Sequence, residues 1–204
     1  MKWMIKMDNE VIKWMVKMDN EVIIALIGVG GTLAGTVLGW VLNNITNRGK
    51  LQIYTSKWKD CFERHDNYGG VCSAENRSET NGLSCDYSLD IYNSSGNVRI
   101  MRDIKFVLSD EKNDFEKQIP NDATTRRTTA GRVRFDEINA LNIPPKTVMR
   151  LDLHNGIWNH EGIPDFIWKV KKIYMTYIDE KNKSHRVLIK DVDYENRFTK
   201  YEEK

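Results

Sequence analysis

An uncharged segment near the beginning of the chain limits its fold more than any other feature. Residues 22–45, about two dozen, contain no charged side chain, and Glu21 and Arg48 flank them. A helix needs about 20 consecutive apolar residues to cross the hydrocarbon core of a bilayer, so the segment is long enough to span one. The apolar run exceeds the roughly 7–15 residues of a signal-peptide core, and no A-x-A-like cleavage site follows Trp40. We therefore predict an uncleaved transmembrane helix over residues 22–45.

Glycines recur at four-residue intervals within this segment. Gly31, Gly35 and Gly39 would form a groove along one helix face, which Gly28 and Thr32 widen. Helices associate in membranes where small residues let their backbones approach closely, so the groove predicts a homo-oligomer joined through this helix. The alternative is that the glycines reflect only the general abundance of glycine in membrane helices. The absence of charge along the segment argues against a conducting pore.

The arm before this segment is a tandem duplication. Residues 2–12 and 13–23 differ only at Ile5 and Val16. An 11-residue repeat keeps equivalent side chains nearly in register along a helix, which predicts an amphipathic arm lying in the membrane interface. The alternatives are a duplication without a new role and a chain whose ancestral start is Met18.

The Lys and Arg residues near the span decide which side of the membrane the rest of the chain occupies. Arg48, Lys50 and two further lysines follow the span, whereas four lysines precede it if translation starts at Met1 and none if it starts at Met18. Lys and Arg favour the cytoplasmic side of a membrane. We expect a single-pass protein of the cell membrane whose globular domain lies in the cytoplasm.

The cysteines and the net charge indicate the compartment of the domain and the class of its partners. An odd number of cysteines, namely Cys61, Cys72 and Cys85, does not make a disulfide framework, and reduced thiols are usual in the cytosol. A bridge between Cys72 and Cys85 is the alternative for an extracellular domain. The formal net charge of +2 provides no basic surface of the kind that nucleic-acid-binding proteins carry. We therefore expect no nucleic-acid partner.

Beyond Lys50, hydrophobic residues alternate with polar ones, which is typical of half-buried strands. The alternation is found in residues 51–55, 85–91, 104–108, 149–153, 173–178 and 185–190. Turn-forming residues separate several of these runs, at 93–97 and 179–184 for example. About seven short, mostly antiparallel strands predict a mainly β protein with an immunoglobulin-like β-sandwich.

The chain therefore divides into five predicted parts. They are an amphipathic arm (1–21), a transmembrane helix (22–45), a linker (46–50), an antiparallel β-sandwich (51–191) and a tail (192–204). Within the sandwich, the polar stretches 67–84 and 120–132 are predicted to be loops. A short helix is predicted in the tail.

One stretch of the predicted sandwich carries a family resemblance. Residues 88–110, SLDIYNSSGNVRIMRDIKFVLSD, resemble paired strands of immunoglobulin-like modules, in which a strand ends at Asn, turns and returns as the next strand. The Cys…Trp…Cys core of true immunoglobulin domains is absent. The whole chain resembles uncharacterised bacterial single-pass membrane proteins of Gram-positive genomes and mobile elements. The resemblance implies an anchored β-domain and no known activity.

Two groups of residues in the sandwich are candidates for contact with a ligand or a partner. Arg126, Arg127, Arg132 and Arg134 lie in a Thr-rich stretch and would bind phosphate, anionic lipid or a nucleotide; a solvated loop is the alternative. Clustered aromatic rings can form a partner surface, although they also close the ends of sandwich cores. The rings in question are Trp158, Phe166 and Trp168.

Catalytic and metal motifs give little support for an enzyme. The acids and imidazoles between Asp152 and Asp165 match no metal-binding spacing, and the sequence contains no P-loop and no GxSxG motif. We expect no cofactor, no bound metal and no enzymatic activity. The predicted function is a membrane-anchored, self-associating protein that binds or senses an unidentified protein or small molecule. The alternative is a membrane-perturbing effector of defence or toxin type, whose helices oligomerise after the β-domain senses a signal.

Overall fold

The computed structural model describes residues 20–66, 70–129 and 132–198. The chain divides into two compact units, residues 1–48 and 49–204, each of which is described by itself. All but the last two residues of the predicted N-terminal arm lie outside the described part of the chain.

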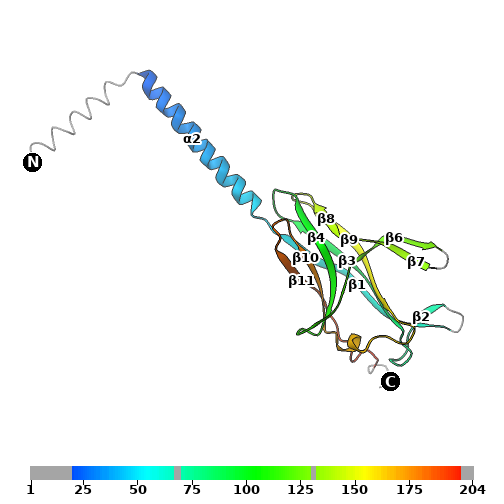
Figure 1. Ribbon diagram of the computed structural model, residues 1–204. Helices are drawn as coiled ribbons and strands as arrows, with labels where there is room; N and C mark the ends of the chain where they lie inside the picture. Colours follow the sequence, from blue (N-terminus) through cyan, green and yellow to red (C-terminus); the bar gives the residue numbers. More distant parts are fainter. Residues whose placement is uncertain (1–19, 67–69, 130–131, 199–204) are drawn as a thin grey trace, which may run out of the picture. The chain divides into compact units, whose positions relative to one another are not determined.

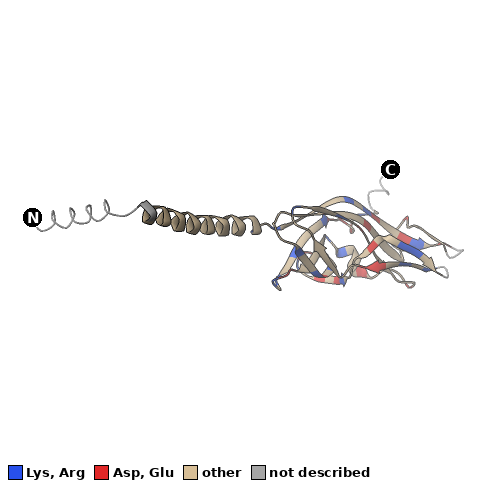
Figure 2. Ribbon diagram, turned by 90° about the horizontal axis from the view of Figure 1, so that it is seen from above, with Lys and Arg blue, Asp and Glu red and all other residues tan. Residues whose placement is uncertain are grey.

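A continuous helix, α2 (Asn20–Asn47), contains the predicted span (Figure 1). Its section Val22–Asn47 is long and apolar enough to cross a membrane, and it carries no charged residue (Figure 2). At 1.5 Å per residue this section measures about 39 Å, which exceeds the roughly 30 Å of a hydrocarbon core. The hydroxyl groups of Thr32 and Thr36 donate to the carbonyl oxygens of Gly28 and Thr32, each at 2.8 Å. The helix thus satisfies these polar groups internally, as a helix in lipid must.

The second unit is a sandwich of two antiparallel sheets, as predicted (Figure 1). The larger sheet has six strands in the order β2-β1-β3-β9-β6-β7. Their bounds are β1 (Leu51–His65), β2 (Val71–Ser73), β3 (Gly82–Asn93), β6 (Asn121–Thr129), β7 (Arg132–Glu137) and β9 (Val148–Trp158). β1, β3 and β9 form its centre, and β6 and β7 form a hairpin that pairs with β9 only at its base.

The smaller sheet has the order β11-β10-β4-β5. Its strands are β4 (Arg99–Ser109), β5 (Asp114–Gln118), β10 (Lys172–Ile178) and β11 (Ser184–Asp191). Two partners share the second edge of β4: β8 (Ala140–Ile143) pairs with its first half and β5 with its second half. Asp103 lies between them with a φ of 49°, a conformation that Asp adopts more readily than most residues.

The hydrophobic core lies between the two sheets. Most inward positions of β3 and β9 carry apolar side chains, and most of the alternate positions carry polar ones, so the predicted period-two pattern is confirmed. The largest fully buried side chains come from both sheets, from the short 3-10 helix η1 (Asp165–Lys169) between β9 and β10, and from the segment after β11. They are Leu83, Leu89, Ile91, Met101, Ile104, Leu108, Ile143, Leu153, Ile167, Ile173, Met175 and Tyr194.

A buried amide organises the corner at which the sandwich begins. The side chain of Asn93 is fully buried, and its Nδ2 donates to the carbonyl oxygens of Asn97, Ile143 and Pro144 at 2.8–3.0 Å. Its Oδ1 accepts hydrogen bonds from the backbone N–H and the hydroxyl of Ser95. One side chain therefore holds the β3–β4 turn against the end of β8.

The first residues of the sandwich are fixed to the same turn. The backbone N–H of Lys50 donates to Ser94 Oγ, which in turn donates to the carbonyl oxygen of Lys50, both at 2.8 Å. A Cβ atom on Gly49 would lie 2.3 Å from backbone atoms of Ser94 and Ser95, so only glycine fits there. The predicted linker therefore ends in residues that belong to the sandwich.

Three parts of the sequence differ from their predictions. The predicted loop over 67–84 is wrong in part, because it contains β2 (Val71–Ser73) and the first residues of β3. The predicted loop over 120–132 is wrong, because β6 occupies Asn121–Thr129 and pairs with β7. Its β-branched threonines favour a strand, and their polarity suits a hairpin that is solvated on both faces. The predicted tail contributes to the core: Tyr194 is 1% exposed, and the described residues 192–198 form turns rather than a helix.

Candidate binding surfaces

The outer face of the larger sheet carries an open groove. Cross-strand pairing aligns its polar residues in two rows, Lys57–Ser88–Asp152 and Lys59–Asp86–His154. Five of these side chains, together with Ala123 at the start of the β6–β7 hairpin, line a groove of ≈ 640 Å³. This volume is within the range of small-ligand sites, roughly 300–1,000 Å³.

Charges within this outer-face groove are only partly paired. His154 Nδ1 lies 2.8 Å from Asp86 Oδ1, and the ring of Phe135 stacks on the imidazole at 4.5 Å. Ser88 donates its hydroxyl to Asp152. Lys57 and Lys59 form no salt bridge with any residue that the structure describes, so their ammonium groups remain available to an anionic or polar ligand.

The serine hydroxyls near the groove form no Ser–His pair in the described part of the chain. The serine hydroxyls of this face donate to carboxylates, Ser84 to Glu63 and Ser88 to Asp152, rather than to His154. A nucleophilic serine needs a base, usually a histidine, within hydrogen-bond reach to accept its proton. These serines are bonded to a carboxylate instead. In the described part of the chain, no group of three or more His, Cys, Asp or Glu residues is arranged to hold a metal ion.

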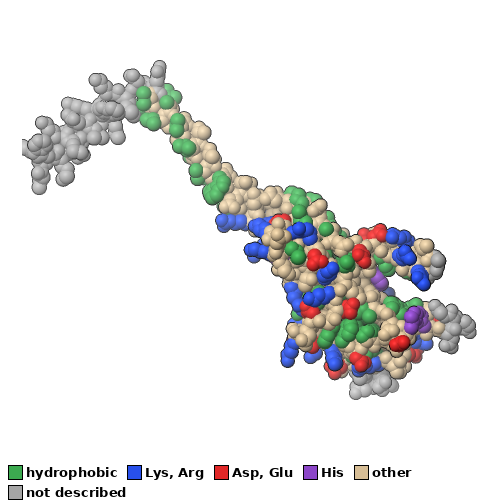
Figure 3. Space-filling model, in the orientation of Figure 1, with side chains coloured by type: hydrophobic (Ala, Val, Ile, Leu, Met, Phe, Trp, Pro, Cys, Tyr) green, Lys and Arg blue, Asp and Glu red, His purple; other side chains and the backbone are tan. Residues whose placement is uncertain are grey.

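The four candidate arginines lie on the β6–β7 hairpin. Arg127 and Arg134 are direct cross-strand partners, and Arg132 pairs with Thr129 nearer the tip. Figure 3 shows basic side chains gathered along this hairpin, which borders a hollow in the surface edged by histidines. Asp136 binds Arg127 at 2.7 Å and raises the pKa of its guanidinium. Like charges directly opposite one another destabilise a strand pair, so an anion bound beside Arg127 and Arg134 would reduce the repulsion between them.

The three candidate aromatic rings do not form one surface. Trp158 is 40% exposed on the outer face of the larger sheet, where its ring covers Gly82, its cross-strand partner. Phe166 is half-buried and stacks on Phe115 at 5.5 Å. Trp168 is 4% exposed and stacks on Phe62 in the core. Only Trp158 remains accessible to a partner, and its contact with Gly82 also gives it a structural role.

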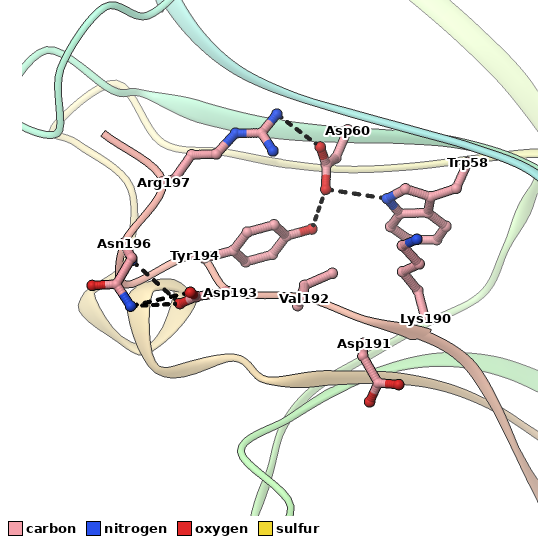
Figure 4. Close-up of a pocket in the computed structure, with 9 residues that line it drawn as sticks. All are labelled: Trp58, Asp60, Lys190, Asp191, Val192, Asp193, Tyr194, Asn196 and Arg197. Atoms are coloured by element: carbon pink, nitrogen blue, oxygen red, sulfur yellow. Dashed lines mark hydrogen bonds and ion pairs between the residues drawn. The ribbon is translucent and has the colours of Figure 1, made fainter. Parts of the chain in front are cut away.

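A second pocket, of ≈ 480 Å³, lies between β1 and the segment after β11 (Figure 4). Asp60 Oδ2 accepts hydrogen bonds from Trp58 Nε1 and from the hydroxyl of Tyr194, both at 3.1 Å. Arg197 donates to Asp60 Oδ1 at 3.0 Å. The carboxylate already has three donors, so we interpret this pocket as a joint that holds residues 192–198 against β1. The outer-face groove is the better candidate for ligand binding.

Comparison with known sequences identifies the domain that carries both surfaces. The sequence model of the YopI Ig-like domain matches residues 49–190, more than half of the chain. The chain belongs to the YopI Ig-like domain family. The match begins at Gly49, the first residue that the structure fixes to the sandwich, and ends just before residues 192–198, which complete the core.

A relative carries the same family name. The chain is 21% identical over 164 residues to the SPbeta prophage-derived uncharacterized protein YopI of Bacillus subtilis (strain 168). The aligned region covers 79% of this chain and 92% of that protein. The predicted resemblance to an uncharacterised protein of a Gram-positive bacterium and a mobile element is therefore confirmed.

Similar solved structures are more distant. The putative ApaA protein from Bordetella pertussis is 10% identical, with a TM-score of 0.33, and the match covers 72% of this chain and 94% of that one. An uncharacterized β-sandwich protein from Clostridium difficile 630 is 15% identical, with a TM-score of 0.28 and coverages of 69% and 86%.

Sequence reasoning missed the residues that line the groove in this YopI Ig-like domain. Asp86 and Ser88 occupy alternate positions of a predicted strand, and Lys57 and Lys59 lie just beyond another one. All four have the sequence pattern of ordinary solvent-facing residues. The signal that they share a face is the period of two itself. Their pairing across β1, β3 and β9 depends on strand order and register, which a single sequence does not contain.

Proposed function

We propose that this protein is a single-pass membrane protein whose YopI Ig-like domain binds a small polar ligand or a partner protein through the outer-face groove. The observation that carries the proposal is the combination of an exposed apolar helix of bilayer length with an Ig-like domain whose groove holds unpaired lysines. Binding, rather than chemistry, is favoured because Ser88, the serine that lines the groove, donates its hydroxyl to Asp152 and not to an imidazole.

The proposed orientation has the Ig-like domain in the cytoplasm, supported by the basic residues Arg48 and Lys50 directly after the span. Native cysteines provide a test, because Cys61 and Cys72 are half-buried thiols that a maleimide can reach. A membrane-impermeant maleimide applied to intact cells should leave the chain unlabelled and should label it after the cells are lysed. Labelling in intact cells would overturn the cytoplasmic orientation.

Self-association through α2 is the second element of the proposal. Nothing lies within 4 Å of where a Cβ atom on Gly31, Gly35 or Gly39 would be, so the glycine face is open to a second helix. Because Thr32 and Thr36 bond within the helix, this face offers close backbone packing without unsatisfied hydroxyls.

The matched variants Gly35→Leu and Gly30→Leu test this face. Both add the same side chain, but Gly30 lies on another side of the helix, given 3.6 residues per turn. We expect Gly35→Leu to weaken self-association at least about tenfold, a loss of ~1.4 kcal/mol, and Gly30→Leu to leave it nearly unchanged. Energy transfer between labelled chains in lipid vesicles measures both. Equal effects of the two variants would contradict a specific glycine interface.

Ligand binding is tested on the groove itself. Lys57→Gln and Lys59→Gln together remove the unpaired cations, whereas Lys112→Gln and Lys181→Gln remove two exposed lysines from turns elsewhere in the domain. We expect a ligand found by a screen of anionic and polar metabolites to lose affinity only in the groove variant. A ligand that binds both variants equally would show that the groove is not its site.

A further inference from the structure

A second surface of the domain combines exposed apolar side chains with basic ones. On the outer face of the larger sheet, at the end where the sandwich begins, Tyr54 and Val148 are 57% and 63% exposed. Tyr92 lies between them on β3, because it is the cross-strand partner of Val148 and is one row from Tyr54. Val98, in the β3–β4 turn at the same end, is 53% exposed. Soluble surfaces expose such side chains singly, so their grouping marks an interaction surface.

Basic residues surround this apolar group. Lys50 precedes β1, Lys146 lies in the β8–β9 turn, and Arg150 is next to Val148 on the same face of β9. Figure 3 shows hydrophobic and basic side chains next to one another at the end of the sandwich that carries β8. Asp90 is the one acid in the rows Gln52–Tyr92–Val148 and Tyr54–Asp90–Arg150, and Arg150 is the one cation there. With Lys50 and Lys146 beside these rows, three cations lie near one acid.

The surface is rigid because two of its lysines meet at one residue. Ser94 Oγ exchanges hydrogen bonds with the backbone of Lys50, and the carbonyl oxygen of Ser94 accepts a hydrogen bond from Lys146 Nζ at 2.6 Å. The buried Asn93 fixes this turn from beneath. The backbone at Lys50 and the ammonium group of Lys146 are thus held at this turn before any partner binds.

We infer that this surface, defined by Tyr54, Tyr92, Val98 and Val148 with Lys50, Lys146 and Arg150, binds the headgroup region of an anionic bilayer. Tyrosines and short aliphatic side chains suit the boundary between headgroups and acyl chains, and Lys and Arg attract anionic phosphates. The chain directly before Gly49 is the apolar segment of bilayer length, which makes a bilayer the available partner. The inference rests on the proposed membrane anchorage.

The test uses the full chain in lipid nanodiscs. Hydrogen–deuterium exchange is measured in discs of phosphatidylcholine alone and in discs that also contain phosphatidylserine. We expect the turns at 94–98 and 144–147 to exchange several-fold more slowly in the anionic discs. The β6–β7 hairpin serves as an internal reference and should exchange equally in both. Equal exchange of the two turns in both kinds of disc would overturn the inference.

Matched charge variants assign the effect to this surface. Lys146→Gln with Arg150→Gln removes two cations from it, whereas Arg132→Gln with Arg134→Gln removes two from the hairpin. We expect the first pair to abolish the slower exchange and the second to preserve it. Loss of the effect only in the hairpin pair would assign lipid contact to the hairpin and overturn the inference.

Further measurements distinguish a wrong assignment of the surface from a disturbed fold or a missing membrane anchor. Val148→Ser changes an exposed side chain, so it should leave the fold intact and weaken the slowing of exchange in anionic discs. It therefore still tests the inference if Lys146→Gln disturbs the Ser94 turn. Protection that grows with the number of chains per disc would assign the surface to a second copy of the chain and overturn the inference. A chain that fails to enter discs at all would contradict the proposed anchorage itself.

Discussion

Arg99 donates a hydrogen bond from Nη2 to the carbonyl oxygen of Gly49 over 2.6 Å. The same guanidinium forms an ion pair with Glu180, in the turn between β10 and β11. One side chain therefore joins the first residue of the Ig-like domain to the far edge of the smaller sheet. The stability of this corner depends on Gly49 and on the buried Asn93 beside it.

Replacing Gly49 with Ala should destabilise the Ig-like domain. The added Cβ would lie 2.3 Å from the backbone of Ser94 and Ser95, where no flexible side chain can move aside. We expect a loss of about 2–4 kcal/mol in the free energy of unfolding. Urea unfolding of the detergent-solubilised chain measures it. Gly156→Ala is the control, since its Cβ would meet its nearest neighbour at an ordinary 3.5 Å; a similar loss in both variants would contradict the argument.

Asn93→Ala should cost about 3 kcal/mol of stability or more, because it leaves the buried carbonyl groups of Ile143 and Pro144 without their donor. The exposed Asn142, on the neighbouring strand β8, provides the control substitution Asn142→Ala, which should change stability by less than about 0.5 kcal/mol. Thermal unfolding followed by circular dichroism compares the two. A loss below about 1 kcal/mol at Asn93 would mean that water replaces its hydrogen bonds.

Asp179 should make the domain less stable in acid. Burial opposes ionisation of its carboxyl, but hydrogen bonds from His185 and from the backbone N–H groups of Lys183 and Lys181 outweigh it and lower the pKa to about 2. Because the folded pKa lies below the ordinary 3.8, this stabilisation is present above about pH 4 and is lost as the pH falls through 2.

The variant Asp179→Asn should therefore lose about 1 kcal/mol at neutral pH, after solvent screening is allowed for, and the difference from the parent chain should shrink towards pH 2. Urea unfolding across this pH range provides the measurement. Asp165→Asn, at an exposed position, should show no such trend. A difference that stays constant with pH would refute the role assigned to the Asp179 carboxylate.

Cys85 should resist thiol reagents in the folded domain. Burial, followed by the negative charge of Asp60, raises the pKa of its thiol far above the ordinary value. Cys61 and Cys72 are half-buried and should react first. Mass spectrometry of the chain after brief alkylation should find two modified cysteines, and three once urea unfolds the domain. Early modification of Cys85 would contradict its burial beneath Tyr194.

Local sequence patterns predicted the elements in which one period dominates. The predicted span was clear because α2 has no charged side chain from Val22 onward, and much of β3 and β9 alternates between apolar and polar side chains. Strand β6 was missed because all its side chains except Ala123 are polar, so no alternation distinguishes it from a loop. Its threonines were the available signal.

The candidate binding surfaces were harder to predict than the strands. Lys59, Asp86 and His154 form one row, although they are distant in sequence, because β3 lies between β1 and β9. Trp168 illustrates the opposite difficulty, since an aromatic ring in a polar stretch has the same local pattern whether it faces a partner or packs on Phe62. Strand order and packing depth decide such cases, and neither is a local property of the sequence.

Tyr194 completes the core and binds Asp60, which precedes it by 134 positions. During synthesis the apolar segment of α2 leaves the ribosome well before this tyrosine is added. The helix can therefore enter a membrane while the Ig-like domain still lacks one side of its core. With the proposed anchorage, folding of the domain follows insertion in time, and a nascent chain stalled before residue 194 would expose the edge of β1 to pairing with other strands.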